Sequence, residues 1–432
     1  MDNRAKQAMM RLVDIRRDEW PALGWAAAWF FCVLAAYYAI RPVRETFGVS
    51  VGHEELAWWW TATFITMLVM TPLYGLVVGR VPRRWLVLVV YGFFIANLVV
   101  FWGLFSQPDL TLTVEVRKVF YVWVSVFILF VVTLFWGSAV DVFHSEQGKR
   151  LFGIIAGAGT LGGVFGSRFA GVMARRIEVH ELLWAPVVLL SVAIVCAWQL
   201  RRYATRQSDS INQIPRSQGW SDAWSGMTHV VRSPYLGGIA ALMVLASICG
   251  TGVYFQMMDL VREAIPNESD RTVWFARINA TQLWLTLFIQ TALASWLIRK
   301  FGLGITLAIV PLVYLLGFSA LWLSPLLGVL AVFEVSHRVA AFSIGVPARE
   351  VLFTLITPDQ KYRAKAFIDT VGKRAGDALA AHGYAALRGL GWLPTSVALA
   401  VLPIAGVLAI LSLTLGRLTQ RRPEQSAVLG KR

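Results

Sequence analysis

Long apolar stretches dominate this chain of 432 residues and restrict its fold more than any other feature. About 20 consecutive apolar residues cross a bilayer as a helix. Twelve stretches of this kind follow one another, at residues 19–44, 57–79, 85–104, 118–142, 150–174, 182–200, 235–258, 273–297, 303–323, 326–353, 362–388 and 394–415. Only 15% of the residues are charged and 57% are hydrophobic, a balance that a soluble domain of this size does not tolerate. The sequence predicts an all-α integral membrane protein with twelve transmembrane helices.

The positive charge of the chain is unevenly placed along it. The net charge is +15, and the basic residues cluster before the first stretch, after the second, between the sixth and seventh, and after the twelfth. With twelve spans all four clusters lie on one side, which the positive-inside rule makes cytoplasmic. We therefore expect a multi-pass membrane protein with both termini in the cytoplasm, and the charge placement argues against a nucleic-acid partner.

The chain divides into two similar halves. The longest polar stretch, residues 201–233, separates six apolar stretches from six. The second half repeats the first at an offset near 213, which sets Gln147 on Gln360, Arg150 on Arg363 and Gly159 on Gly372. Two six-helix bundles of this kind are typical of the major facilitator architecture. We expect an N-terminal segment at 1–18, bundles at 19–200 and 234–416 joined by the linker 201–233, and a tail at 417–432.

Two arginines stand near the outer end of the first stretch. Arg41 and Arg44 are three residues apart, so both can project to one face of a helix, and Glu45 follows them. One interpretation is that they snorkel to the membrane interface. The other is a pair that grips an anion, because guanidinium groups match phosphate and carboxylate oxygens bidentately.

Stretch 326–353 carries a second charged group. Glu334, His337 and Arg338 are spaced to face one another on a helix, and we interpret them as a self-compensating ion-pair cluster. Arg349 and Glu350 follow near its inner end and are kept as candidates for solute binding.

Stretch 362–388 carries charges of alternating sign every four residues, at Lys365, Asp369, Lys373 and Asp377. A stripe this polar inside a membrane predicts a helix that faces a water-filled cavity. The matching positions of the first half are uncharged, so the charge is concentrated in the second bundle.

Stretch 150–174 is instead rich in glycine. Residues 157–162 match the pattern GxGxxG, but no strand precedes them, so we reject a dinucleotide site and expect no cofactor. Small residues three and four apart let membrane helices approach closely. Neither a catalytic constellation nor metal-ligand spacing stands out, and the sequence does not indicate an enzyme.

Several motifs resemble those of the ATP/ADP translocases of plastids and obligate intracellular bacteria, which exchange nucleotides. The similarity covers most of the chain outside its termini and linker, and its motifs occur in the same order: residues 38–45 (YAIRPVRE), 135–141 (FWGSAVD), 145–150 (SEQGKR), 347–350 (PARE) and 365–369 (KAFID). The resemblance implies a major-facilitator-like fold and an anionic solute. The chain also resembles free-living bacterial relatives of these exchangers, which implies a location in the bacterial inner membrane. The chain differs from the exchangers at Arg44 and Arg349, where the exchangers carry lysine. It also has no match for an acidic residue expected in the eighth helix, where Gln282 is one of the polar candidates.

Carried over position by position, the resemblance implies a set of substrate-binding or gating residues. Together with Arg41 and Lys373 from the charge pattern, the set is Arg41, Arg44, Asp141, Arg349, Glu350, Lys365, Asp369 and Lys373. Basic members would hold phosphate oxygens, and acidic members would hold the basic groups while the site is empty.

Three functions stay open on the sequence. The first is a secondary transporter that moves an organic, phosphorylated, nucleotide-like anion by alternating-access exchange, with the lipid bilayer and a small solute as partners and a monomer as the default state of the fold. The second is a proton-coupled transporter of another solute, such as a drug, a peptidoglycan fragment or a siderophore. The third is a membrane scaffold that does not transport.

Overall fold

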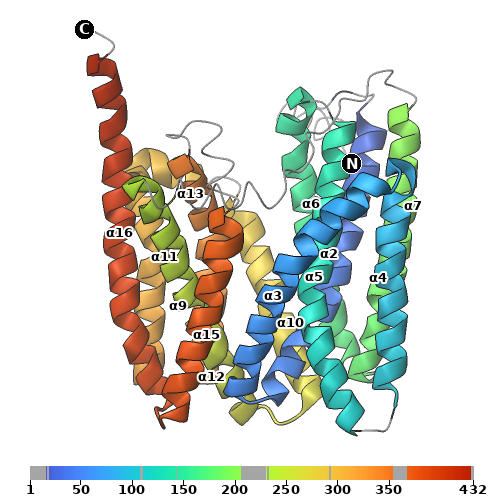
Figure 1. Ribbon diagram of the computed structural model, residues 1–432, viewed down its shortest axis with the longest axis horizontal. Coiled ribbons are helices and arrows are strands. Elements are labelled where there is room, and N and C mark those ends of the chain that lie inside the picture. The colour runs from blue at the N-terminus through green and yellow to red at the C-terminus, as the bar shows by residue number, and fades with distance from the viewer. Residues whose placement is uncertain are drawn as a thin grey trace, which may run out of the picture. The chain divides into compact units, whose positions relative to one another are not determined.

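The computed structural model describes residues 16, 19–107, 110–143, 145–205, 230, 233–290, 293–353 and 367–429. All regular structure in these residues is helical, which confirms the predicted all-α class (Figure 1).

The helices of the first sequence half follow one another with short connections. They are α2 (Trp20–Ser50), α3 (His53–Arg80), α4 (Arg83–Phe105), α5 (Leu110–Val142), α6 (Ser145–Met173), the 3-10 helix η1 (Val179–Leu183) and α7 (Trp184–Thr205).

The second half has the same helical character but contains two π-helical segments. Its elements are α9 (Pro234–Ala264), α10 (Glu268–Gln290), α11 (Leu293–Leu323), α12 (Leu327–Ala340), the π-helix η2 (Ala341–Gly345), α13 (Val346–Leu352), the π-helix η4 (Ile368–Gly372), α15 (Lys373–Gly389) and α16 (Pro394–Leu429). Single π-helical turns are rare and are frequent at functional sites.

Ten helical segments of the described chain are long and apolar enough to cross a membrane. The predicted stretch 273–297 falls mainly on α10 and ends on the first residues of α11. Helix α10 is not among the ten, because it contains more polar and charged residues than they do. The predicted stretch 362–388 begins outside the described residues, and its described helix α15 has 17 residues. Membrane spanning is therefore supported, while the exact number of twelve spans stays a prediction.

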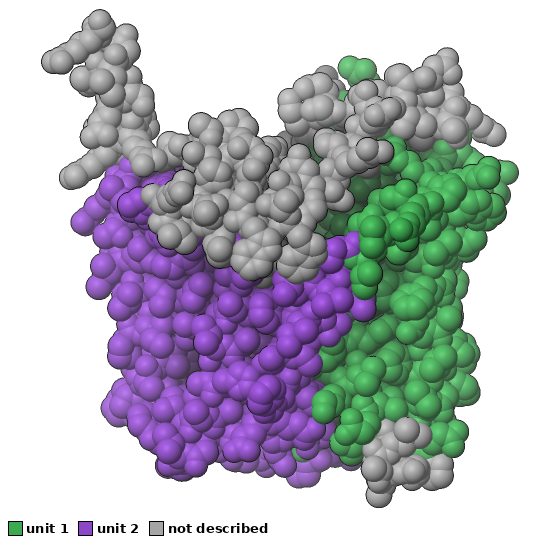
Figure 2. Space-filling model, in the orientation of Figure 1, with its two compact units in different colours: residues 1–46, 73–217, 268–283 green, residues 47–72, 218–267, 284–432 purple. Residues whose placement is uncertain are grey.

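The chain forms two compact units, which Figure 2 shows in different colours. Unit 1 comprises residues 1–46, 73–217 and 268–283, and unit 2 comprises residues 47–72, 218–267 and 284–432. Each unit thus includes a segment from the other sequence half: the first part of α10 belongs to unit 1, and the first part of α3 to unit 2. The predicted linker 201–233 lies mostly outside the described residues, so the domain boundary stays a prediction.

The glycine-rich helix α6 packs against α2 within unit 1. A Cβ added at Gly162 would overlap the backbone of Phe31, and one added at Gly166 would overlap the backbone of Ala35. A side chain at either position would therefore push the two helices apart. This contact confirms the interpretation of the glycines as close-packing residues and not as a nucleotide loop.

Candidate functional site

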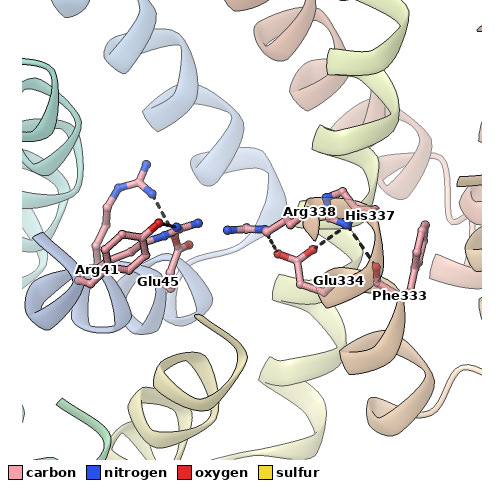
Figure 3. A network of polar contacts seen from close by, with 8 residues as sticks. Arg41, Glu45, Phe333, Glu334, His337 and Arg338 are labelled. Carbon is pink, nitrogen blue, oxygen red and sulfur yellow. Dashed lines mark hydrogen bonds and ion pairs between the residues drawn. The ribbon is translucent and has the colours of Figure 1, made fainter. Parts of the chain in front are cut away.

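A carboxylate and two guanidinium groups form a compact cluster on α2. Oε1 of Glu45 lies 3.6 Å from Nε of Arg41 and 3.2 Å from Nη1 of Arg44 (Figure 3). The Glu45 side chain is only 3% exposed, and the two arginine side chains are 13% and 14% exposed. The cluster is thus mostly buried among the described residues, while the choice between interfacial snorkelling and anion binding stays a prediction.

Aromatic residues of unit 1 hold the two guanidinium groups in place. Arg44 lies over the ring of Tyr121 at 3.9 Å, and its Nε donates a hydrogen bond of 3.1 Å to the carbonyl oxygen of Tyr121. Arg41 donates to the hydroxyl of Tyr38 at 3.5 Å and lies 5.5 Å from the centre of that ring. Cation–π contacts and hydrogen bonds from the planar guanidinium group fix the orientation of an arginine, and its positive charge can still attract an anion.

A second charged cluster lies on α12 in unit 2, and Figure 3 also shows it. Glu334 is 1% exposed; its Oε1 is 2.5 Å from Nε of Arg338, and its Oε2 is 3.5 Å from Nδ1 of His337. The same Nδ1 lies 3.3 Å from the carbonyl oxygen of Phe333. The predicted self-compensating cluster is confirmed.

Arg349 and Glu350 lie on α13, directly after the π-helix η2. Nη2 of Arg349 is 3.7 Å from Oε1 of Glu350, and its Nη1 is 2.7 Å from Sδ of Met243 on α9. The arginine is 15% exposed and the glutamate 39%. This pair repeats the arrangement on α2, in which a basic candidate is held by an acid next to it in the chain.

The structure describes only part of the charged stripe. Lys365 lies outside the described residues, and only the backbone of Asp369, within η4, is described. Lys373 is exposed at the start of α15, whereas Asp377 is buried and accepts hydrogen bonds from Ser247 and Thr251 of α9. The last member of the stripe therefore ties α15 to α9, while a cavity facing the other members stays a prediction.

Asp141 lies at the end of α5, in contact with Arg83 at the start of α4. Its Oδ2 is 3.4 Å from Nη1 of Arg83, and the carbonyl of Arg83 in turn accepts a hydrogen bond from Arg201. In this structure Asp141 thus helps to join the ends of α5, α4 and α7. Its role in solute binding stays a prediction.

Three buried polar side chains of unit 1 have an atom with no hydrogen-bond partner among the described residues. They are Ser167 of α6 (Oγ) and Asn279 and Gln282 of α10 (Nδ2 and Oε1), each at most 3% exposed. Such groups cost about 1–3 kcal/mol each unless something binds them. Of these three residues, the sequence points only to Gln282. A single serine or asparagine is common in an apolar helix and gives no sign of a special role.

The first copy of the repeated motif has a clear structural partner. Arg150 donates to Oε1 of Glu19 at 2.9 Å, and Gln147 donates to the same oxygen at 3.1 Å. Burial raises the pKa of Glu19, but hydrogen bonds from the Arg16 backbone, Arg150 and Gln147 outweigh it, so the pKa lies below its ordinary value. The motif thus fixes the start of α6 to the start of α2. The second copy lies outside the described residues.

Known proteins with similar folds are membrane transporters. A bacterial homologue of the iron transporter ferroportin, in an inward-facing state, matches with a TM-score of 0.66 at 13% identity, covering 93% of this chain and 98% of that one. The nucleoside transporter NupG matches with a TM-score of 0.63 at 14% identity, over 93% of this chain and 98% of its own. This protein has the fold of the major facilitator transporters. No protein-family model matches the chain.

Sequence similarity relates the chain to proteins named ADP,ATP carriers. It is 22% identical over 281 residues to ADP,ATP carrier protein 1 of Chlamydia trachomatis serovar D, covering 56% of this chain and 53% of the carrier. It is 22% identical over 279 residues to the chloroplastic ADP,ATP carrier protein 2 of Arabidopsis thaliana, covering 56% of this chain and 45% of that carrier. The chain spans about half the length of the curated relatives that it matches. The resemblance inferred from the motifs is thus confirmed as a distant relationship.

Proposed function

We propose that this protein is a secondary transporter that exchanges an organic, phosphorylated, nucleotide-like anion across the bacterial inner membrane, with both termini in the cytoplasm. The proposal rests on the carboxylate of Glu45, which contacts the guanidinium groups of both Arg41 and Arg44. In the empty site, this carboxylate occupies the position that an anionic group of the solute would take. An arriving phosphate would compete with the glutamate for two oriented guanidinium groups.

The energetics of this exchange of partners favour a reversible site. Removing a charge from water is costly unless an opposite charge compensates it. Glu45 supplies that compensation while the site is empty, and the solute supplies it when bound. Arg349 with Glu350 in unit 2 offers the same arrangement, so each unit contains a basic group whose acid can be replaced.

The two comparisons support different parts of the proposal. The fold supports transport, and the sequence relationship to proteins named ADP,ATP carriers supports a nucleotide as the solute. The unpartnered atoms of Ser167, Asn279 and Gln282 offer both donors and acceptors to an uncharged part of such a solute.

The test is an exchange assay in proteoliposomes. Vesicles are loaded with unlabelled nucleotides, and uptake of labelled ATP and ADP is followed with and without a pH gradient. We expect uptake that depends on the internal nucleotide. Arg44→Ala should weaken it about 10- to 100-fold, the usual effect of losing a hydrogen bond to a charged group.

The matched control is Arg176→Ala, which removes an exposed arginine just after α6. Folding of all proteins is verified by size-exclusion chromatography and thermal melting. If no nucleotide drives exchange in folded wild-type protein, the nucleotide proposal is wrong. Equal effects of the two variants would remove the α2 cluster from the site.

A second candidate function is proton-coupled transport of another solute, and the α12 cluster favours it. Glu334 is buried, and a proton on its carboxyl would weaken the ion pair to Arg338. Protonation would thereby make Arg338 available to a solute. Coupling predicts that a pH gradient drives net accumulation without internal solute and that Glu334→Gln abolishes this accumulation. Accumulation that persists in this variant would contradict it.

A further inference from the structure

Helices α4 and α7 of unit 1 lie side by side (Figure 1). Both helices carry tryptophans toward each of their ends. Trp102 of α4 contacts Trp184 of α7 at one end, with ring centres 5.3 Å apart. Trp85 and Trp198 lie near the opposite ends of the same helices and are 49% and 52% exposed. Trp85 and Trp102 are about 25 Å apart along the helix, close to the thickness of the hydrocarbon core. The two pairs therefore mark two interfacial levels of a membrane.

Arginines gather at the level of Trp85 and Trp198. They come from the end of α3, the start of α4 and the end of α7, and they are Arg80, Arg83, Arg84, Arg201 and Arg202. Arg201 donates a hydrogen bond to the carbonyl oxygen of Arg83, which places the start of α4 beside the end of α7. We call these five arginines with Trp85 and Trp198 the α4/α7 basic patch.

Arginines outnumber acidic residues in the part of this patch that the structure describes. Asp141, 3.4 Å from Arg83, is the acid that the described residues place against it. Five arginines and one aspartate give this part of the described chain a positive excess of charge. Because Arg84 and Arg202 are exposed, this excess is presented to the surroundings at the membrane interface.

The tryptophans orient the exposed arginines. The guanidinium of Arg202 lies 3.7 Å from the ring centre of Trp198, and that of Arg84 lies 5.9 Å from the ring centre of Trp85. An arginine stacked on an interfacial indole presents its N–H groups at headgroup level, and its fork matches phosphate oxygens. The apolar surface of α4 and α7 beyond the indoles, with Leu88 44% and Val195 53% exposed, suits acyl chains.

We propose that the α4/α7 basic patch is a binding site for an anionic phospholipid. The phosphate of the headgroup is held by Arg84 and Arg202 across the seam of the two helices, and the acyl chains lie along the exposed faces of α4 and α7. Basic groups between transmembrane helices at the interface recognise such headgroups by charge. The site is independent of the proposed exchange of solute.

The test measures lipid binding with no transported solute present. Purified full-length protein in a neutral detergent is titrated with phosphatidylglycerol or phosphatidylcholine, and the melting temperature and native mass spectra are recorded. We expect phosphatidylglycerol to raise the melting temperature and to remain bound, with phosphatidylcholine much weaker. The preference should decrease at high salt, because ionic screening weakens interfacial charge attraction.

The decisive variant is Arg84→Ala/Arg202→Ala, for which we expect binding of phosphatidylglycerol to fall roughly 30-fold. Arg84→Lys/Arg202→Lys keeps the charge and should retain most of the binding. The matched control is Arg175→Ala/Arg176→Ala, which removes two exposed arginines just after α6. Its binding should stay within twofold of the wild type.

Three results would overturn the proposal. The first is equal binding of the two lipids by wild-type protein. The second is an equal loss in both double alanine variants, which would indicate unspecific charge attraction. The third is equal protection by inorganic phosphate, which would indicate a site for a free anion in place of a lipid.

Discussion

Gly166 of α6 lies directly against the backbone carbonyl of Ala35 in α2, with no room between them for a side chain. Gly162 has the same relationship with Phe31 one turn earlier. The two contacts let the helix backbones touch, and close packing of this kind is a main source of helix association in a membrane, where the hydrophobic effect between helices is absent.

Gly166→Ala should therefore lower the stability of unit 1 by about 3 kcal/mol, because the added methyl group forces α2 and α6 apart. Gly157→Ala, on the same helix, is the control: a Cβ there meets nothing within 4 Å among the described residues. It should stabilise the helix by about 0.5–1 kcal/mol through the helix propensity of alanine. Melting temperatures of the purified variants measure both effects, and equal melting temperatures would contradict the contact.

The sequence predicts this packing well because the signal is local. Glycines three and four residues apart on one helix show which face of that helix lets another helix come close, although they do not show which helix packs there. The cluster of Glu334, His337 and Arg338 is predictable for the same reason, since its members share two turns of α12.

Contacts between distant residues are not predictable in this way. Glu19 and Arg150 are 131 positions apart, and Ser247 and Asp377 are 130 apart, yet each pair is joined by a hydrogen bond. The charge pattern of the stripe gives Asp377 the same expected surroundings as Lys373. Only the packing of α15 on α9 shows that one is buried and the other exposed.

Glu19 makes a pH-dependent contribution to stability. Its pKa is lowered in the folded protein, so its contribution is present above the ordinary pKa of a glutamate and is lost as the pH falls through the lowered value. Glu19→Gln should therefore destabilise the protein by about 2 kcal/mol at pH 7. At pH values below the lowered pKa, the variant and the wild type should melt alike.

Melting curves from about pH 7 to pH 3 test the Glu19 prediction, because the ordinary pKa of glutamate is about 4.3. Glu55→Gln, at an exposed position near the start of α3, is the control and should change the melting temperature little at any pH. A difference between Glu19→Gln and the wild type that grows as the pH falls would have the wrong sign and would contradict the assigned hydrogen bonds.

Glu334 and Arg338 should depend strongly on each other. Glu334→Gln leaves the mostly buried guanidinium of Arg338 without its close carboxylate, and removal of one partner from a buried ion pair costs about 3–5 kcal/mol. The double variant Glu334→Gln/Arg338→Met removes both charges and should recover most of that loss. A double-mutant cycle on melting temperatures measures the coupling. Additive losses in the double variant would mean that the pair does not interact.

Arg44 offers a test of whether geometry or charge alone makes the α2 cluster suitable for an anion. Arg44→Lys keeps the charge but loses the Nε–H donor to the Tyr121 carbonyl and the planar contact with the Tyr121 ring. We expect its apparent affinity in nucleotide exchange to fall about three- to tenfold, less than in Arg44→Ala, since one oriented hydrogen bond contributes about 1 kcal/mol. The concentration dependence of labelled ADP uptake measures this, with Arg176→Lys as the control. Affinity equal to that of the wild type would show that Tyr121 does not orient the group, and a loss as large as in Arg44→Ala would show that charge contributes little.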